Sequence, residues 1–162
     1  EIEVAVTDTD FTFPSQLSLG AGIGKPKTWF VGLEYVNQKT SNLTNRTFEL
    51  ENITYTDATK YKIGGFYIPQ YNSLTSYYKR IVYRAGIRFE ETGINLNGQG
   101  INEFGISFGV GIPVGRLFSN VNVGFEIGKR GTTDFGLIQE NFFNTFISLS
   151  FNDRWFDKRY LD

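Results

Sequence analysis

Apolar and polar positions alternate along most of the chain from Ser15 onward. Between residues 102 and 113, bulky apolar side chains occupy every second position and glycine occupies most of the others. A period of two is typical of a β-strand, because successive side chains point to opposite faces of the sheet. The same period recurs in six further stretches, at 16–24, 28–36, 60–68, 80–90, 120–128 and 144–153. We therefore expect about seven strands and an all-β, antiparallel fold.

The pattern itself does not identify the solvent on each face, and a soluble sandwich or lipocalin-like barrel with its apolar face inward remains an alternative. Two features favour the inverse arrangement, an antiparallel transmembrane β-barrel with the apolar face toward lipid. The apolar faces are unbroken, whereas the opposite faces carry Gly, Ser and Asn interrupted by charges. Each strand is also close to the ~9–11 residues that cross a bilayer at a tilt.

Aromatic residues near the strand ends point the same way, because membrane barrels place aromatic girdles at both interfaces. These residues are Trp29, Tyr67, Tyr77, Tyr78, Phe118, Phe151, Trp155 and Phe156.

The connections between strands differ in length. Residues 24–27 and 114–119 form short links, residues 37–57 a long polar one, and residues 69–79, 91–100 and 129–140 links of intermediate or greater length. Outer-membrane barrels alternate short periplasmic turns with longer extracellular loops. We therefore expect a location in the bacterial outer membrane, with the first short link and the C-terminus in the periplasm.

Seven is an odd number of strands, whereas bacterial barrels formed by a single chain have an even number. An open sheet would also leave unpaired backbone groups in lipid. We therefore expect residues 15–153 to form barrel strands within a larger barrel and residues 1–14 to be a loop or the end of a preceding strand, with Ile2, Val4 and Val6 alternating. Residues 154–162 are expected to form a periplasmic tail.

The composition removes most kinds of active site. The chain has no Cys, His or Met, and its 16 basic and 17 acidic residues give a net charge of −1. Disulfides, thiolate metal sites and histidine chemistry are therefore excluded, and nucleic acid is a poor candidate partner. Residues 20–25 resemble a phosphate loop only superficially, because Pro26 stands where Ser or Thr should follow. Glu90 and Glu91 point to opposite faces of a strand, so they do not form a hydrolytic pair. Since no other catalytic constellation is present, we expect no enzyme activity, no cofactor and no metal.

Charged side chains on the glycine-bearing faces are the strongest candidates for a functional site. Their signs alternate between neighbouring strands, which favours a ladder of cross-strand ion pairs; a polar filter or an anchor for a ligand headgroup is the alternative. In the ladder interpretation, reversing the charge of Arg88 or Glu103 alone should destabilise the barrel. Reversing both, so that the two charges are exchanged, should partly restore its stability. We expect the lower lumen to be lined mainly by Gly and Ser. The charged residues expected to line the lumen are Glu34, Lys60, Lys62, Arg84, Arg88, Glu90, Glu103, Glu126 and Arg130. Those expected to face lipid are Ile106, Phe108, Val123, Phe125, Ile147 and Leu149.

Several segments resemble outer-membrane proteins of the FadL-like family, especially its members in the Bacteroidetes. They are residues 13–22, 29–35, 64–69, 79–86, 101–109, 130–133 and 152–156. The resemblance implies a 14-stranded barrel, of which this chain is the C-terminal half, and the passage or binding of hydrophobic solutes. The family's N-terminal hatch has no counterpart here.

Relatives of this barrel also serve in multi-protein complexes such as the type 9 secretion machinery. A non-transporting structural or plug subunit is therefore the alternative function. The expected partners are outer-membrane lipid, a hydrophobic small molecule and other envelope proteins.

Overall fold

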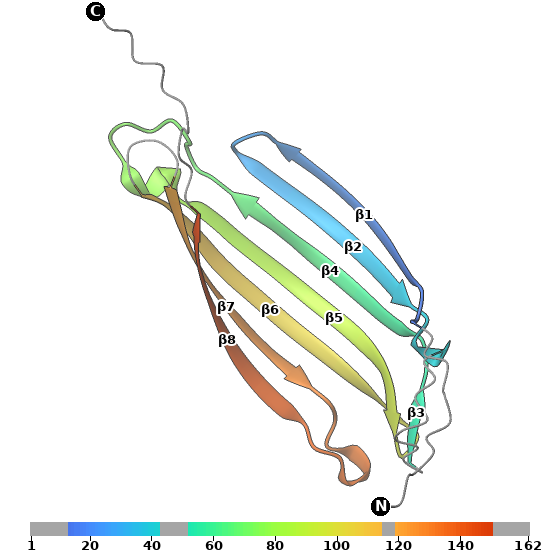
Figure 1. Cartoon of the computed structure of the whole chain (residues 1–162). Coiled ribbons are helices and arrows are strands. Elements are labelled where there is room, and N and C mark those ends of the chain that lie inside the picture. The colour runs from blue at the N-terminus through green and yellow to red at the C-terminus, as the bar shows by residue number, and fades with distance from the viewer. Residues whose placement is uncertain (1–12, 43–51, 115–118, 151–162) are drawn as a thin grey trace, which may run out of the picture.

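A computed structural model of the chain describes residues 13–42, 52–114 and 119–150. These residues form one antiparallel sheet in the order β1-β2-β4-β5-β6-β7-β8 (Figure 1). A short strand β3 lies outside this path and pairs with β5. The strands are β1 (Gln16–Lys25), β2 (Trp29–Gln38), β3 (Ile53–Tyr55), β4 (Ala58–Tyr67), β5 (Val82–Leu96), β6 (Gln99–Val114), β7 (Ser119–Arg130) and β8 (Glu140–Ser150).

In the described part of the chain, short 3₁₀ helices lie in the connections: η1 (Thr40–Asn42), η3 (Tyr77–Arg80) and η4 (Asp134–Gly136). Within the described ranges, no helix has the length and apolar character that a membrane crossing requires. The all-β, antiparallel prediction is confirmed, as is the count of about seven strands along the main path.

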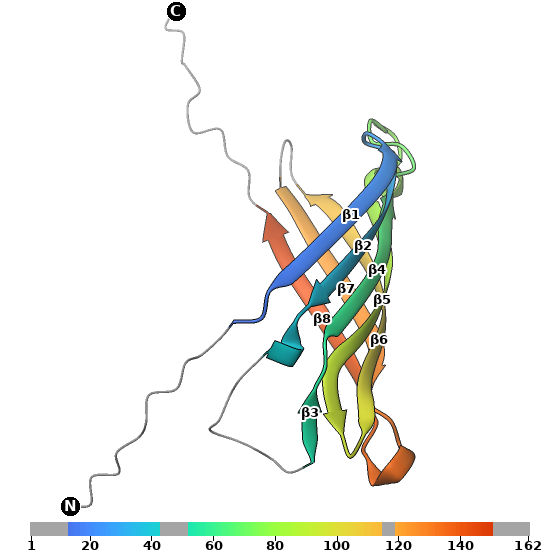
Figure 2. The same ribbon diagram turned by 90° about the vertical axis from the view of Figure 1, so that its right-hand side faces the viewer.

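The sheet is curved into a trough rather than closed (Figure 2). In the described part of the chain, β1 pairs only with β2 and β8 pairs only with β7, so both outer edges lack a neighbour. Closure into a barrel therefore stays a prediction. The expectations for residues 1–12, for strand residues 151–153 and for the tail 154–162 lie outside the described residues, as do those for Phe118, Phe151, Trp155 and Phe156.

The two ends of the sheet differ. At the end that we call the turn end, residues 26–28 join β1 to β2, residues 68–81 join β4 to β5, and β8 finishes. At the opposite end, the hairpin end, β5 and β6 extend beyond their neighbours and β3 pairs with the extension (Figures 1 and 2).

The prediction of a longer link at residues 91–100 is wrong. These residues continue β5 and β6, which are 15 and 16 residues long and meet in a two-residue turn at Asn97 and Gly98. Both turn residues have positive φ, 51° and 77°. An Asn-Gly pair is favoured in such turns because the two residues tolerate this conformation and its twist matches that of the strands. The polar sequence around the turn resembles a loop, and the Asn-Gly pair is the signal for a hairpin.

The register gives the sheet two different faces. One row of cross-strand partners runs through Gly22, Gly32, Gly64, Gly86 and Ser107, and the next row runs through Ile23, Val31, Gly65, Ala85 and Phe108. We call the glycine-rich and charged face the inner face, because it lines the trough, and the apolar face the outer face. Among the described residues, Ile68 is the only buried hydrophobic residue, so the outer face is an exposed apolar surface.

Candidate functional site

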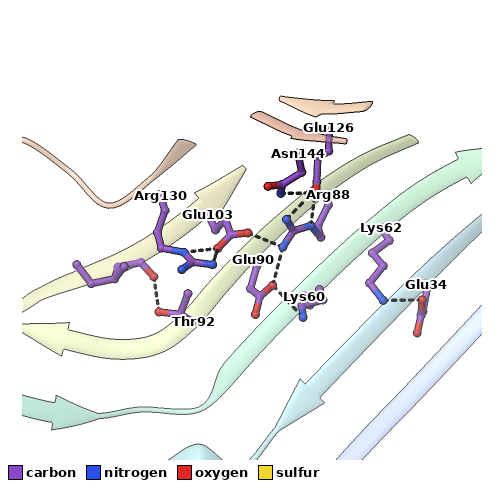
Figure 3. A network of polar contacts seen from close by, with 11 residues as sticks. Glu34, Lys60, Lys62, Arg88, Glu90, Thr92, Glu103, Glu126, Arg130 and Asn144 are labelled. Carbon is purple, nitrogen blue, oxygen red and sulfur yellow. Dashed lines mark hydrogen bonds and ion pairs between the residues drawn. The ribbon is translucent and has the colours of Figure 1, made fainter. Parts of the chain in front are cut away.

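A cluster of charged side chains lies on the inner face toward the hairpin end (Figure 3), with Arg88 at its centre. The Arg88 guanidinium lies 2.6 Å from Glu103 Oε1, 2.8 Å from Glu126 Oε1 and 3.2 Å from Glu90 Oε2. Glu103 is 4% exposed, which makes it a buried carboxylate in an otherwise open sheet. Because a buried carboxylate is stable only when it is paired, Glu103 depends on the cations around it.

Gly105 on β6 explains how Arg88 on β5 reaches Glu126 on β7. Arg88 and Gly105 are direct register partners, so the absent side chain leaves a gap across β6. A Cβ atom at Gly105 would lie 2.8 Å from Glu126 Oε1 and 3.6 Å from an Arg88 guanidinium nitrogen. The glycine therefore leaves room for the guanidinium to reach across β6, so that it joins three strands.

Further ion pairs and hydrogen bonds extend the cluster toward both edges of the sheet. Arg130 on β7 pairs with Glu103, and Lys60 on β4 lies 2.8 Å from Glu90. On β8, Asn144 donates a hydrogen bond of 3.4 Å to Glu126. The resulting network ties β4 through β8 together across the inner face.

A separate ion pair lies nearer the edge of the sheet that β1 forms. Lys62 Nζ is 3.1 Å from Glu34 Oε2, and Ser18 of β1 donates to Glu34 at 3.2 Å. Arg84 stands apart from these ion pairs and donates to Asn122 Oδ1 at 3.0 Å. All nine predicted charged residues thus lie on the inner face, and the cross-strand ladder is confirmed; the lining of a closed lumen stays a prediction.

The ladder differs from the predicted one in its details. Glu103 faces Glu90 in the register and contacts Arg88 diagonally. Exchanging Arg88 and Glu103 would place a carboxylate beside Glu90 and Glu126 and a guanidinium beside Arg130. The exchange is therefore not a valid test of the ladder, because it creates new repulsion on both sides.

The inner face encloses a hollow of about 920 Å³ that reaches from β1 to β8. Glycines line much of it, but the expectation of a lining made mainly of Gly and Ser was incomplete. Phe30 and Phe146 also line the hollow, and the Phe30 ring lies against Gly22 and Gly32 and stacks on Phe66, with 6.1 Å between the ring centroids. The signal in the sequence is a phenylalanine on the polar face of a strand beside glycines of the next strand.

The six residues predicted to face lipid all lie on the outer face. Several are largely exposed, with Phe108 at 56% and Ile147 at 72%. At the turn end, Trp29, Tyr67 and Tyr83 are successive register partners and form an aromatic row across three strands. An exposed apolar surface of this extent marks a contact with membrane or protein; contact with lipid stays a prediction.

The charged side chains of the network bind one another, so few of them are left to bind or react with another molecule. Each cluster carboxylate contacts a cation, and the described residues include no group of His, Cys, Asp and Glu side chains that could hold a metal ion. The arrangement is suited to fixing the relative positions of strands.

Comparison with known protein families identifies the chain. The family model described as BamG matches residues 1–162, which is the whole sequence. The chain belongs to the BamG family. No curated protein and no solved structure matched it.

Membership of the BamG family overturns the resemblance to FadL-like transporters. Short alternating segments with glycines on one face are shared by unrelated membrane barrels, so the segments that carried the resemblance are not specific to one family. The 14-strand count and the passage of hydrophobic solutes lose their basis with it. The BamG family points to association with the bacterial outer membrane, and it fits a subunit of an envelope complex better than a transporter.

Proposed function

We propose that this BamG-family chain is a non-transporting structural subunit of a multi-protein complex in the bacterial outer membrane, without enzyme activity. The observation that carries the proposal is the match of the BamG family over the whole chain, and the open sheet supports it. In a bilayer, unpaired edges such as those of β1 and β8 are costly, because lipid offers no hydrogen bonds. Strands contributed from elsewhere would remove that cost.

The direction of the strands narrows what can complete the sheet. The main path has seven strands in antiparallel order, so β1 and β8 run in the same direction. Closing the sheet on itself, or with a second copy in the same membrane orientation, would therefore pair parallel strands. Antiparallel closure requires an odd number of additional strands, which a different partner or another segment of the protein could supply.

The inner-face network supports a structural role. Transport requires side chains that bind and release a solute, whereas these charges bind one another across β4 to β8. The cluster would maintain the curvature of the sheet, while the edges at β1 and β8 remain available for pairing with further strands. The absence of His and Cys from the sequence supports the non-enzymatic part of the proposal.

The experiment is site-specific photo-crosslinking of the full chain in the outer membrane, combined with co-purification. A photoreactive residue at Leu19 in β1 or at Ile147 in β8 should give crosslinks to a stable envelope partner. The same residue at Ile63 in the interior strand β4 is the matched control and should give no such crosslinks, because both neighbours of β4 are strands of this chain. Purification of the chain alone, with no edge crosslinks and with fatty-acid uptake into liposomes, would refute the proposal.

The membrane-facing assignment of the outer face is tested separately by cysteine labelling, which is simple because the chain has no native Cys. In the membrane-embedded protein, single cysteines at Ile106, Phe108 or Val123 should resist a water-soluble maleimide. A cysteine at Ser107 on the inner face should react, since the trough is polar and open. Ready labelling of the apolar row together with protection of Ser107 would invert the assignment.

A further inference from the structure

The outer face has a groove at its centre. The groove lies over Gly65 and Ala85, which are register partners and the smallest residues in a row that also holds Val31 and Phe108. Gly65 cannot carry a side chain, because a Cβ atom there would collide with the backbone carbonyl of Phe30. The result is a hollow of about 690 Å³ in an otherwise bulky apolar surface.

The groove leads toward the turn end. Tyr67 and Tyr83 line it where β4 finishes and β5 begins. The Tyr83 hydroxyl donates to the backbone carbonyl of Tyr78 at 3.2 Å, which places η3 beside the mouth of the groove. The Tyr77 hydroxyl donates to the carbonyl of Pro113 at 2.6 Å and holds the same helix against β6.

Among the described residues, positive charge collects at this end without a countercharge. Lys25 and Lys27 lie at the β1–β2 turn, and Lys79 and Arg80 lie in η3. The two connections adjoin, because the Ile68 amide donates to the Thr28 carbonyl at 2.6 Å. The described carboxylates all lie from the middle of the sheet to the hairpin end: Glu34, Asp57, Glu90, Glu91, Glu103, Glu126, Asp134 and Glu140.

None of these four cations forms an ion pair within the residues that the structure describes. Lys27 lies 5.0 Å from the centre of the Tyr71 ring, and Arg80 lies 4.9 Å from that of Tyr77. The Arg80 Nε atom is buried and has no hydrogen-bond partner. These aromatic contacts orient the cations and leave their charge available to an anion.

We propose that the groove and the adjoining cations bind an anionic glycerophospholipid, with one acyl chain along Gly65 and Ala85 and the phosphate at Lys79 and Arg80. A peptide fits less well, because β4 and β5 are paired on both sides and offer no free backbone hydrogen bonds. An acyl chain requires none, and clustered Lys and Arg beside a membrane attract anionic headgroups. The proposal rests on the membrane-facing assignment made for the proposed function.

The test uses the full chain in phosphatidylcholine nanodiscs that contain a small fraction of phosphatidylglycerol with a photoreactive acyl chain. Crosslinks should map to the groove, and unlabelled phosphatidylglycerol should compete where phosphatidylcholine does not. Each cation near an anionic lipid is worth about a fivefold change in binding, so Lys79→Gln/Arg80→Gln should weaken competition about 25-fold. Lys129→Gln, an exposed cation near the hairpin end, is the matched control and should change nothing.

A second pair of variants tests the groove itself. Ala85 is exposed, so Ala85→Leu can fill the groove without disturbing the inner face, and it should abolish the groove crosslinks. Ile127→Leu, on the same face away from the groove, should leave them intact. Equal competition by phosphatidylcholine, preference for a lipid A probe, or unchanged labelling in both Ala85→Leu and the double variant would overturn the proposal.

Co-purification with envelope proteins is measured on the same preparations. Loss of lipid selectivity with partners retained overturns the lipid site alone. Loss of partners with selectivity retained overturns only the subunit function.

Discussion

The charge cluster allows a quantitative test of what holds the sheet in shape. We consider a double-mutant cycle on Arg88 and Glu103, with glutamine as the replacement on both sides because it removes the charge and keeps most of the volume. Arg88 contacts three carboxylates and is one-quarter exposed, whereas Glu103 is nearly inaccessible. The two singles should therefore differ in their effects.

The expected sizes follow from those contacts. Glu103→Gln removes the carboxylate that binds Arg88 and Arg130, but Arg88 keeps Glu126 and Glu90, so the free energy of unfolding should fall by about 2 kcal/mol. Arg88→Gln leaves three carboxylates close together without their shared cation and should cost about 3 kcal/mol, the lower end for breaking a buried pair. The double variant relieves part of that repulsion, so the coupling energy should be about 1–2 kcal/mol.

The Lys62–Glu34 pair serves as the internal control, because both of its side chains are 41% exposed and its separation is similar. Exposed pairs couple by ~0.2–1 kcal/mol. Both cycles can be measured by urea unfolding of the full chain in lipid vesicles, followed by tryptophan fluorescence. If the Arg88–Glu103 coupling is no larger than the Lys62–Glu34 coupling, the cluster does not act as a partly buried network and the structural argument fails.

Two further predictions concern other parts of the sheet. Gly22→Ala should destabilise the protein by about 1–2 kcal/mol, because the new methyl group displaces the Phe30 ring from its place against β1. Gly20→Ala is the control: the atom nearest to its new methyl group is 3.6 Å away, so it should have little effect in the same unfolding assay. At the hairpin end, Lys39 donates a hydrogen bond of 2.5 Å to Asp57 and lowers the pKa of this carboxyl group. The contact therefore stabilises the junction of η1 with the start of β4 above the ordinary Asp pKa of about 3.9, and this stabilisation is lost as the pH falls through the lowered value. Hydrogen exchange of Thr40–Asn42 and Ala58 should therefore accelerate on acidification relative to the rest of the sheet, and Asp57→Asn should remove that dependence.

The strands could be predicted because alternation is a local property that the register then preserves. The identity of the ion pairs could not, because Arg88 reaches Glu126 across a glycine on the intervening strand and sequence spacing does not show this path. Phe146 was missed for a related reason: its place on the inner face becomes clear only when it is aligned with Gly124 of the neighbouring strand. The family assignment failed because alternating segments report the surroundings of a strand rather than its ancestry.

The Asn97-Gly98 hairpin has a consequence for how the protein folds. β5 and β6 are the longest of the described strands, they lie in the middle of the sheet, and their turn is only two residues long. Pairing across so short a turn costs little loop-closure entropy, so we expect this hairpin to form first and later strands to add outward from it. β1 and β8 would then be the last to gain protection in pulse-labelled hydrogen exchange. A sheet that folds from its centre outward leaves its two edges unpaired for longest. An incoming strand then has time to pair with an edge before the edges contact other molecules.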